Sequence, residues 1–155
     1  MAEISKKRTW IWVAVIGAIL IGGGVPGGIL LYRSLNAPES VEVVNITVHE
    51  AKAMIDDNAT YPNLIVLDIR LDYEYTAGHL NESEWIPWNG ALGSFEGGES
   101  ALSGNETTEI IVYCNSGTRS AGGSQFLVDA GFTIIFNMIG GITEWLNQGY
   151  PTTTT

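Results

Sequence analysis

Beyond residue 40, short apolar runs alternate along the chain with segments whose apolar residues recur at helical spacing. Each run is too short for a helix and rich in β-branched or other apolar residues, so it predicts a strand. The predicted strands are 41–46, 64–67, 109–113 and 133–137. The predicted helices are 48–57, 71–76, 119–130 and 142–147. Strands that alternate with helices predict an α/β fold with a parallel sheet and a ligand site at the carboxyl ends of its strands.

Polar residues mark some of the expected boundaries. Thr47 and Glu50 fit a capping box at the start of the first helix, and Gly131 stops the third helix. Residues 89–108 form a Gly-, Ser- and Glu-rich connection without a predicted element. We expect this connection to be exposed and mobile, as long loops generally are.

An uncharged segment of 23 residues, 10–32, precedes the predicted domain. With a helical rise of about 1.5 Å per residue, it is long enough to span a bilayer core of about 30 Å. Its Gly and Pro residues are tolerated in membrane spans, although they would weaken the helix midway and could kink or break it. The predicted organisation is a cytoplasmic tail (1–9), a transmembrane anchor or uncleaved signal (10–32), a linker (33–40), the α/β domain (41–150) and a tail (151–155).

The charges around this segment predict its orientation. Three basic residues at 6–8 precede it, whereas only Arg33 follows closely, before Glu39 and Glu42. The positive-inside rule then predicts a single-pass protein of the cell membrane whose domain lies outside the cytoplasm. A cleaved signal peptide is the competing interpretation, but the segment is longer than a usual signal core and 35–37 is a poor cleavage site.

Four Asn-x-Ser/Thr sequons fit an external domain, although a chain rich in Asn and Thr also produces such triplets by chance. They begin at Asn45, Asn58, Asn81 and Asn105.

Net charge disfavours one class of partner. Beyond residue 35, the chain has 16 acidic residues and three basic ones, a formal charge of −13 (3 − 16). The basic residues are Lys52, Arg70 and Arg119. Nucleic acid is therefore not an expected partner. A saline or acidic habitat would account for this composition.

Cys114 is the only cysteine, and it opens a tight loop behind the apolar strand 109–113. The loop reads Cys114-Asn115-Ser116-Gly117-Thr118-Arg119-Ser120. Loop amides, the start of the following helix and the guanidinium of Arg119 would all lower the pKa of a thiol. A lone cysteine at a strand end is usually a small buried apolar residue, but packing alone requires neither Gly117 nor Arg119. We therefore predict that Cys114 is a nucleophile.

The pattern Cys-x-x-Gly-x-Arg behind a buried strand resembles the active-site loop of the rhodanese (sulfurtransferase) family. Other segments resemble signatures of that family in the same order. They are Leu67-Asp68-Ile69-Arg70, Glu74-Tyr75-Thr76-Ala77-Gly78-His79-Leu80, Ile86-Pro87 and Gly140-Gly141-Ile142-Thr143-Glu144-Trp145. The resemblance covers roughly residues 41–150, and it implies a three-layer domain with a mostly parallel central sheet flanked by helices.

For the reaction, the resemblance implies a relay of sulfane sulfur. The Cys114 thiolate attacks the outer sulfur of thiosulfate or a persulfide, holds it as a persulfide and passes it to a thiophilic acceptor. Amides of the loop would stabilise the charged sulfur, and Arg119 would bind the anionic remainder of the donor. The implied substrate-binding residues are Asn115, Ser116, Gly117, Thr118 and Arg119.

Asp68, Arg70, Glu74 and His79 are interpreted as structural support. In the resembling family these positions mainly brace the fold and the entrance to the site. An Asp-x-Arg pair at a strand end is more often a buried ion pair than an acid/base dyad, and a lone histidine is more often structural. No cluster of His and Cys has metal-ligand spacing, so we predict neither a metal nor another cofactor.

Two features leave the donor and the activity open. Many family members carry Arg or Lys where this chain has Asn115, and the acidic surface would repel anionic donors unless salt screens it or the donor is a protein or neutral persulfide. The loop is also one residue shorter than the Cys-x5-Arg loop of dual-specificity phosphatases and arsenate reductases, which suits a single sulfur better. A non-enzymatic adaptor that binds a partner protein is the other alternative, against which the intact Cys114 and Arg119 argue.

Overall fold

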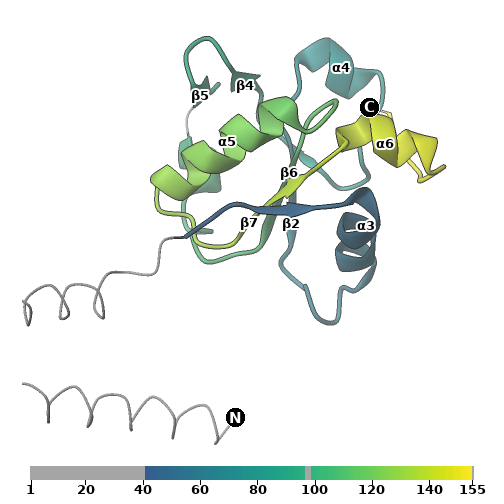
Figure 1. Cartoon of the computed structure of the whole chain (residues 1–155), viewed down its shortest axis with the longest axis horizontal. Helices are drawn as coiled ribbons and strands as arrows, with labels where there is room; N and C mark the ends of the chain where they lie inside the picture. The colour runs from purple at the N-terminus through teal and green to yellow at the C-terminus, as the bar shows by residue number, and fades with distance from the viewer. Residues whose placement is uncertain (1–40, 97–98, 155) are drawn as a thin grey trace, which may run out of the picture. The chain divides into compact units, whose positions relative to one another are not determined.

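The computed structural model describes residues 41–96 and 99–154, and its centre is a five-stranded sheet in the order β1-β7-β6-β2-β3 (Figure 1). In that order the strands are Val44–Ile46, Ile135–Met138, Ile110–Tyr113, Ile65–Asp68 and Glu84–Trp85. All neighbouring strands pair in parallel. The predicted parallel sheet is therefore confirmed, with β6 as its central strand.

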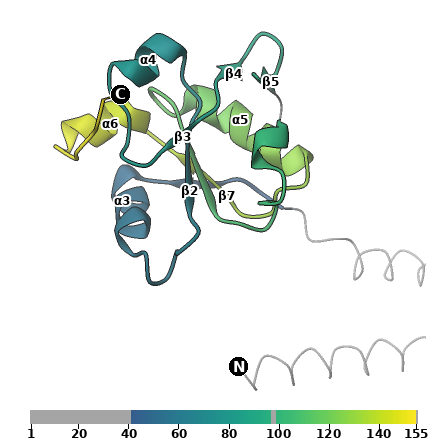
Figure 2. The same ribbon diagram turned by 180° about the vertical axis from the view of Figure 1, so that it is seen from behind.

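Helices cover both faces of this sheet, as the views from front and back show (Figures 1 and 2). The helices are α3 (Val48–Asp56), α4 (Asp72–Thr76), α5 (Thr118–Asp129) and α6 (Gly141–Asn147), with a short 3₁₀ helix, η1, at Glu99–Leu102. One apolar cluster joins the sheet to Leu127 of α5. A second joins the opposite face to Ala51 of α3 and Trp145 of α6. The predicted three-layer α/β arrangement is confirmed.

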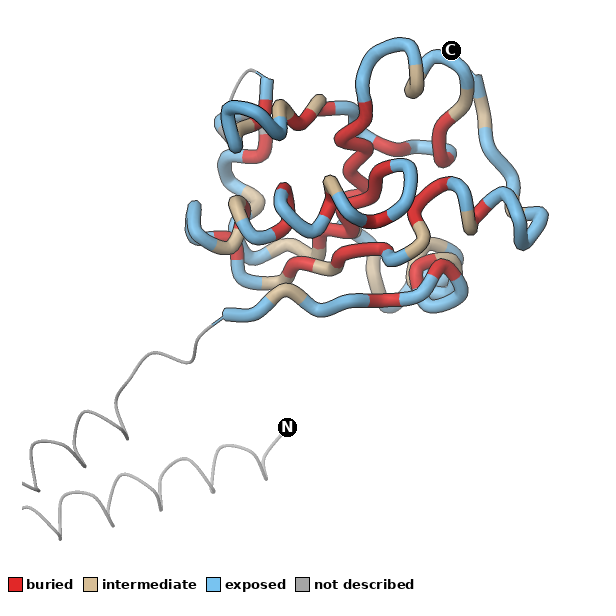
Figure 3. The backbone as a smooth tube through the Cα atoms, turned by 45° about the horizontal axis from the view of Figure 1, so that its top comes forward, coloured by how far each residue is buried: buried red, intermediate tan, exposed pale blue. Residues whose placement is uncertain are grey.

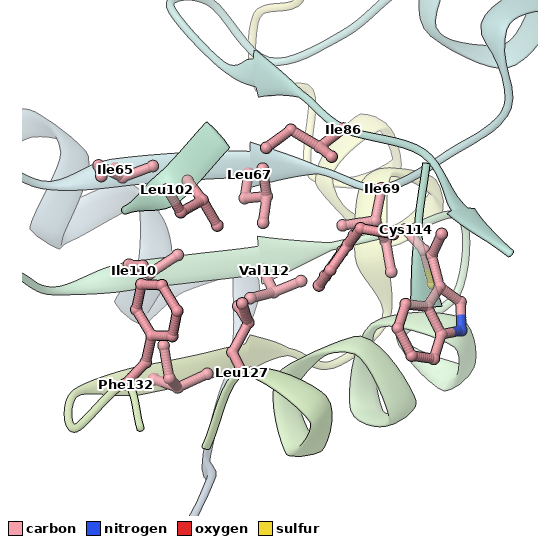
Figure 4. Close-up of a cluster of buried hydrophobic side chains, with 13 residues drawn as sticks. Ile65, Leu67, Ile69, Ile86, Leu102, Ile110, Val112, Cys114, Leu127 and Phe132 are labelled. Carbon is pink, nitrogen blue, oxygen red and sulfur yellow. The ribbon is translucent and has the colours of Figure 1, made fainter. Parts of the chain in front are cut away.

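The central strand is buried along its whole length, which explains its continuous apolar sequence. Residues 110–113 are 0% exposed. The buried positions of the domain gather in its interior (Figure 3). Because side chains alternate along a strand, Ile110 and Val112 point into the α5 cluster, whereas Ile111 and Tyr113 point into the opposite one. Cys114 continues the first series and closes that cluster at the end of β6 (Figure 4).

The expected helix boundaries agree with the structure. The hydroxyl of Thr47 accepts the Glu50 amide at 3.2 Å, and the Glu50 carboxylate accepts the Thr47 amide at 2.7 Å. These reciprocal bonds form the predicted capping box of α3. Gly131 follows α5 with a φ of +102°, which glycine adopts at little cost. β1, however, begins at Val44, three residues later than predicted, and the side chain of Val44 is half-exposed.

Residues 89–108 are more structured than predicted. β4 (Trp88–Asn89) and β5 (Ser94–Phe95) form an antiparallel hairpin. The Phe95 ring is 4% exposed and lies edge-on to Trp88 and Phe126, with centroid distances of 5.0 and 5.6 Å. Leu102 of η1 is 1% exposed. The expectation of an exposed connection was wrong at these positions, because a few apolar residues inside a Gly-rich segment suffice to anchor it to the core.

The predicted membrane segment, tail and linker, residues 1–40, lie outside the described residues. Within 41–96 and 99–154, no helix has the length and apolar character needed to cross a bilayer. At the other end of the chain, residues 151–155 were predicted to form a tail, but some of them make hydrogen bonds with the domain. His79 and Thr153 exchange two backbone hydrogen bonds of 2.9 Å, and the indole N–H of Trp145 donates to the carbonyl of Pro151 at 2.9 Å.

Candidate active site around Cys114

The loop between β6 and α5 surrounds the sulfur of Cys114 with hydrogen-bond donors. Sγ accepts the amide of Gly117 at 3.2 Å, the amide of Ser120 at 3.4 Å and the hydroxyl of Ser120 at 3.5 Å. Gly117 is the N-cap of α5 and has a φ of +93°, a conformation that turns its amide back toward the strand end. The sulfur therefore lies at the start of α5, where anions are favoured.

This arrangement favours the thiolate. Burial of Cys114 acts to raise the pKa of the thiol. The Ser120 hydroxyl and the amides of Ser120, Ser116 and Gly117 act in the opposite direction and outweigh burial, so that the pKa lies below its ordinary value. A larger thiolate fraction at neutral pH is what a nucleophilic cysteine requires.

Backbone amides at the start of α6 donate hydrogen bonds to the Cys114 loop. The amide of Ile142 donates to the carbonyl of Cys114 at 2.9 Å, and the amide of Thr143 donates to the carbonyl of Asn115 at 3.1 Å. A Cβ atom on Gly141 would lie 2.4 Å from the Cys114 carbonyl oxygen and 2.6 Å from the Asn115 carbonyl. Only glycine permits this approach, so Gly141 is a positioning residue for the loop.

Arg119 does not lie free beside the sulfur but forms a two-bond ion pair with Glu74 of α4. Its two terminal nitrogens donate to the two carboxylate oxygens at 2.7 and 2.6 Å. The hydrogen bond from Arg119 lowers the pKa of Glu74, although partial burial of the carboxylate opposes it. Glu74 also accepts the amide of Leu71 at 3.0 Å. Glu74, predicted to be structural support, is thus in direct contact with the arginine of the loop.

Asp68 and Arg70 form the expected buried ion pair. Arg70 Nη2 donates to Asp68 Oδ2 at 2.7 Å and to the carbonyl of Gly78 at 2.7 Å. The side chains of Arg70 and Asp68 are only 5% and 0% exposed. The ring of His79 stacks on Tyr75 with centroids 3.8 Å apart. The bond from Arg70 to Gly78 connects the end of β2 to the segment that follows α4, and the stacking of His79 on Tyr75 holds that segment against α4.

The remaining predicted loop residues lie on the surface. Asn115, Ser116 and Thr118 are exposed. The hydroxyls of Ser116 and Thr118 are 3.5 Å apart, and Thr143 donates to the side-chain oxygen of Asn115 at 3.4 Å. These polar groups lie on the exposed side of the loop. Within the described residues, no group of three or more His, Cys, Asp or Glu side chains is placed to hold a metal ion.

Ser120 is a residue of the site that the sequence analysis did not place in the substrate-binding set. It is fully buried and contributes both its amide and its hydroxyl to Sγ. In the sequence it resembles an ordinary serine in the first turn of a helix, where a capping role is the usual explanation. The left-handed turn at Gly117 brings Ser120 back over the sulfur, and only the folded loop shows this.

A sequence model described as "Rhodanese-like domain" matches residues 47–148. The chain belongs to the rhodanese-like domain family. A second comparison agrees: rhodanese-like domain-containing protein 17 of Arabidopsis thaliana is 30% identical over 130 residues, which cover 78% of this chain and 80% of that protein. The tRNA uridine(34) hydroxylase of Escherichia coli is 28% identical over 106 residues, which make up 66% of this chain but only 29% of that enzyme.

Solved structures share the rhodanese-like fold. A rhodanese-related protein from Thermoplasma volcanium superposes with a TM-score of 0.56 at 26% identity and covers 72% of this chain and 99% of its own. The thiosulfate sulfurtransferase of Pseudomonas aeruginosa superposes with a TM-score of 0.58 at 23% identity, covering 72% of this chain and 20% of its own. The second likeness concerns the fold alone. The family resemblance in the sequence is confirmed, and the family includes sulfurtransferases.

Proposed function

We propose that this rhodanese-like domain is a sulfurtransferase that takes sulfane sulfur from thiosulfate or a persulfide onto Cys114 and passes it to a thiophilic acceptor. The observation that carries the proposal is the set of three donors around Sγ, from Gly117 and Ser120. Packing of a small apolar side chain would require none of them, whereas each of them stabilises an anionic sulfur.

The reaction is a pair of displacements at sulfur. The Cys114 thiolate attacks the outer sulfur of the donor, a new S–S bond forms, and the donor's own S–S bond breaks with its electron pair on the leaving thiolate or sulfite. Cys114 then carries a persulfide, whose outer sulfur is attacked by the acceptor, and the Cys114 thiolate is regenerated. The amide of Gly117 and the hydroxyl of Ser120, which donate hydrogen bonds to Sγ, stabilise the negative charge that returns to this sulfur in the second displacement.

The experiment that tests the proposal is a mass measurement on the full-length chain. Incubation with thiosulfate, or with a low-molecular-weight persulfide, should add the mass of one sulfur atom, and cyanide should remove it as thiocyanate. The Cys114→Ser variant, shown to be folded by circular dichroism, should gain no mass. A folded, reduced wild-type protein that takes up no sulfur from either donor would contradict the proposal.

Two other functions are separated by the same variant. A non-enzymatic adaptor would bind its partner protein equally well with Cys114→Ser, whereas sulfur transfer requires the thiol. A phosphatase or arsenate reductase would release phosphate from an aryl phosphate or reduce arsenate. The pairing of Arg119 with Glu74 disfavours this chemistry, because the guanidinium that would hold a phosphate is already bound to a carboxylate.

The location belongs to the proposal as well. The uncharged segment 10–32 would anchor the protein in the cell membrane with the domain outside the cytoplasm, as the flanking charges favour. Protease treatment of intact cells should then digest the domain. If the domain survives until the cells are lysed, the external placement is wrong.

Transfer RNA appears in the name of the hydroxylase relative. It is a disfavoured substrate for this chain, because the described domain is strongly acidic and would repel the phosphates of RNA.

A further inference from the structure

Every lysine and arginine in the described part of the chain is paired with a carboxylate. The pairs are Lys52 with Asp56, Arg70 with Asp68, and Arg119 with Glu74. The same residues, 41–96 and 99–154, include 15 Asp and Glu, a formal net charge of −12 (3 − 15). A small anion that approaches this domain therefore meets a negative surface without an unpaired Lys or Arg side chain to attract it.

The loop around Cys114 also lacks an unpaired cationic side chain. Arg119 is the sole cationic side chain of the loop 114–120, and both terminal nitrogens of its guanidinium are bound by Glu74. Asn115, at the position after the nucleophile, is exposed and uncharged. The loop's amides favour one negative charge on Sγ, but no side chain here compensates a second or third.

We infer that Glu74 sets the donor specificity of Cys114: by neutralising Arg119, it selects sulfane-sulfur donors with little or no net negative charge over dianions such as thiosulfate. This inference rests on the proposed sulfur transfer and names its substrate class. Suitable donors include zwitterionic thiosulfonates and persulfides carried on a neutral or cationic molecule. Glu74 acts through Arg119 and does not itself touch the reacting sulfur.

The same bonds form and break with all these donors, so their charge can be varied within one type of reaction. Differences in leaving group and size are corrected by the loading rate of a small free thiol with the same donor. In each case the Cys114 thiolate attacks the outer sulfur, the donor's S–S bond breaks, and a sulfite or sulfinate ion leaves with the electron pair. Thiosulfate carries two negative charges, methanethiosulfonate one, and 2-aminoethanethiosulfonate has an ammonium group that brings its net charge to zero. The rate of mass gain at Cys114 can be compared along this series.

For the full-length wild-type chain, we expect loading to be at least about tenfold faster with 2-aminoethanethiosulfonate than with thiosulfate at about 0.1 M salt. The ratio should shrink at about 1 M salt, where the Debye length falls from about 10 Å to about 3 Å. A ratio near one at the lower salt concentration would overturn the inference. If no member of the series loads Cys114, and a low-molecular-weight persulfide also fails, the sulfur transfer itself is refuted together with its donor class.

Two variants test whether the ion pair between Glu74 and Arg119 causes the difference in loading rate between the zwitterionic donor and thiosulfate. Glu74→Gln keeps an oxygen that can accept the Leu71 amide but releases the charge of Arg119, so thiosulfate loading should rise by about tenfold with little change for the zwitterion. Asn115→Arg adds a cation at an exposed position and should shift the ratio in the same direction. The matched control is Asp72→Asn, which removes an exposed negative charge from the same helix without touching Arg119.

A merely structural role for Glu74 predicts a different result. Loosening of the loop would slow all donors together and leave the ratio between them unchanged. Equal slowing in Glu74→Gln, or a shift in the ratio that Asp72→Asn reproduces in full, would overturn the assignment to Glu74. Asn115→Arg keeps the inference falsifiable if Glu74→Gln does not fold, because a ratio unaffected by a new cation in the loop would contradict control by charge.

Discussion

Replacing Gly141 with alanine tests whether α6 sets the geometry of the Cys114 loop. Gly141 has a φ of +57°, and an added Cβ would lie 2.4 Å from the Cys114 carbonyl oxygen. An ordinary contact is about 1 Å longer, so either the loop or the start of α6 must move by that amount. This movement would stretch the hydrogen bonds that Ile142 and Thr143 donate to the loop.

The expected cost follows from these contacts. Left-handed backbone conformation costs a non-glycine residue about 1 kcal/mol, and each of the two hydrogen bonds contributes about 1 kcal/mol. The free energy of unfolding should therefore fall by about 3 kcal/mol, which a domain with about 5–15 kcal/mol of stability survives. A displacement of about 1 Å at the nucleophile should also slow sulfur loading per folded molecule by about 100-fold.

Gly149→Ala is the matched control, because Gly149 has a φ of +72° but no atom within 4 Å of an added Cβ. It should cost about 1 kcal/mol and leave loading unchanged. Urea unfolding followed by tryptophan fluorescence gives the free energies, and mass spectrometry gives the loading rates. If Gly141→Ala costs no more than Gly149→Ala and loads sulfur at the wild-type rate, α6 does not position the loop.

Four further predictions concern the thiol, the buried ion pair and the hairpin. Alkylation of Cys114 by iodoacetamide should have its pH midpoint below that of a free cysteine thiol measured in parallel, since the folded state favours the thiolate. Ser120→Ala should move the midpoint upward and slow loading at neutral pH by about fivefold, the equivalent of a hydrogen bond of about 1 kcal/mol; an unchanged midpoint would remove Ser120 from the site. Arg70→Met leaves Asp68 buried without its partner and should lower the free energy of unfolding by about 3–5 kcal/mol, while loading per folded molecule stays the same. Phe95→Ala should cost about 3–5 kcal/mol by urea unfolding, and an effect below about 0.5 kcal/mol would restore the original expectation of an exposed connection.

Local signals predicted the elements that carry them. The capping box at Thr47 and Glu50, the stop at Gly131 and the continuous apolar run of β6 each depend on residues close together in sequence. Parallel strands follow from the alternation of strands with helices. The sheet, and the place of Cys114 at the carboxyl end of one of its strands, could therefore also be predicted. Family motifs added the α6 segment without saying what it contacts.

The features that the sequence did not predict depend on distant contacts. Strands β3, β4 and β5 have two residues each, too few for a periodic pattern. Burial of Phe95 depends on the space above Gly123 of α5, where an added Cβ would lie 3.4 Å from the Phe95 ring. The ion pair between Glu74 and Arg119 joins residues 45 positions apart. Each residue alone matched a motif, but only the fold shows that one neutralises the other.

The position of Cys114 at the end of β6 links the proposed sulfur transfer to strand register. Ile110, Val112 and Cys114 enter the same apolar cluster because they alternate with Ile111 and Tyr113. A shift of β6 by one residue against its neighbours would turn every side chain to the opposite face and direct the thiol toward α3 and α6. Refolded protein that loads sulfur must therefore have its central strand in the native register. Sulfur loading thus measures the correctly folded fraction of a sample, which spectra of overall helix and strand content do not distinguish.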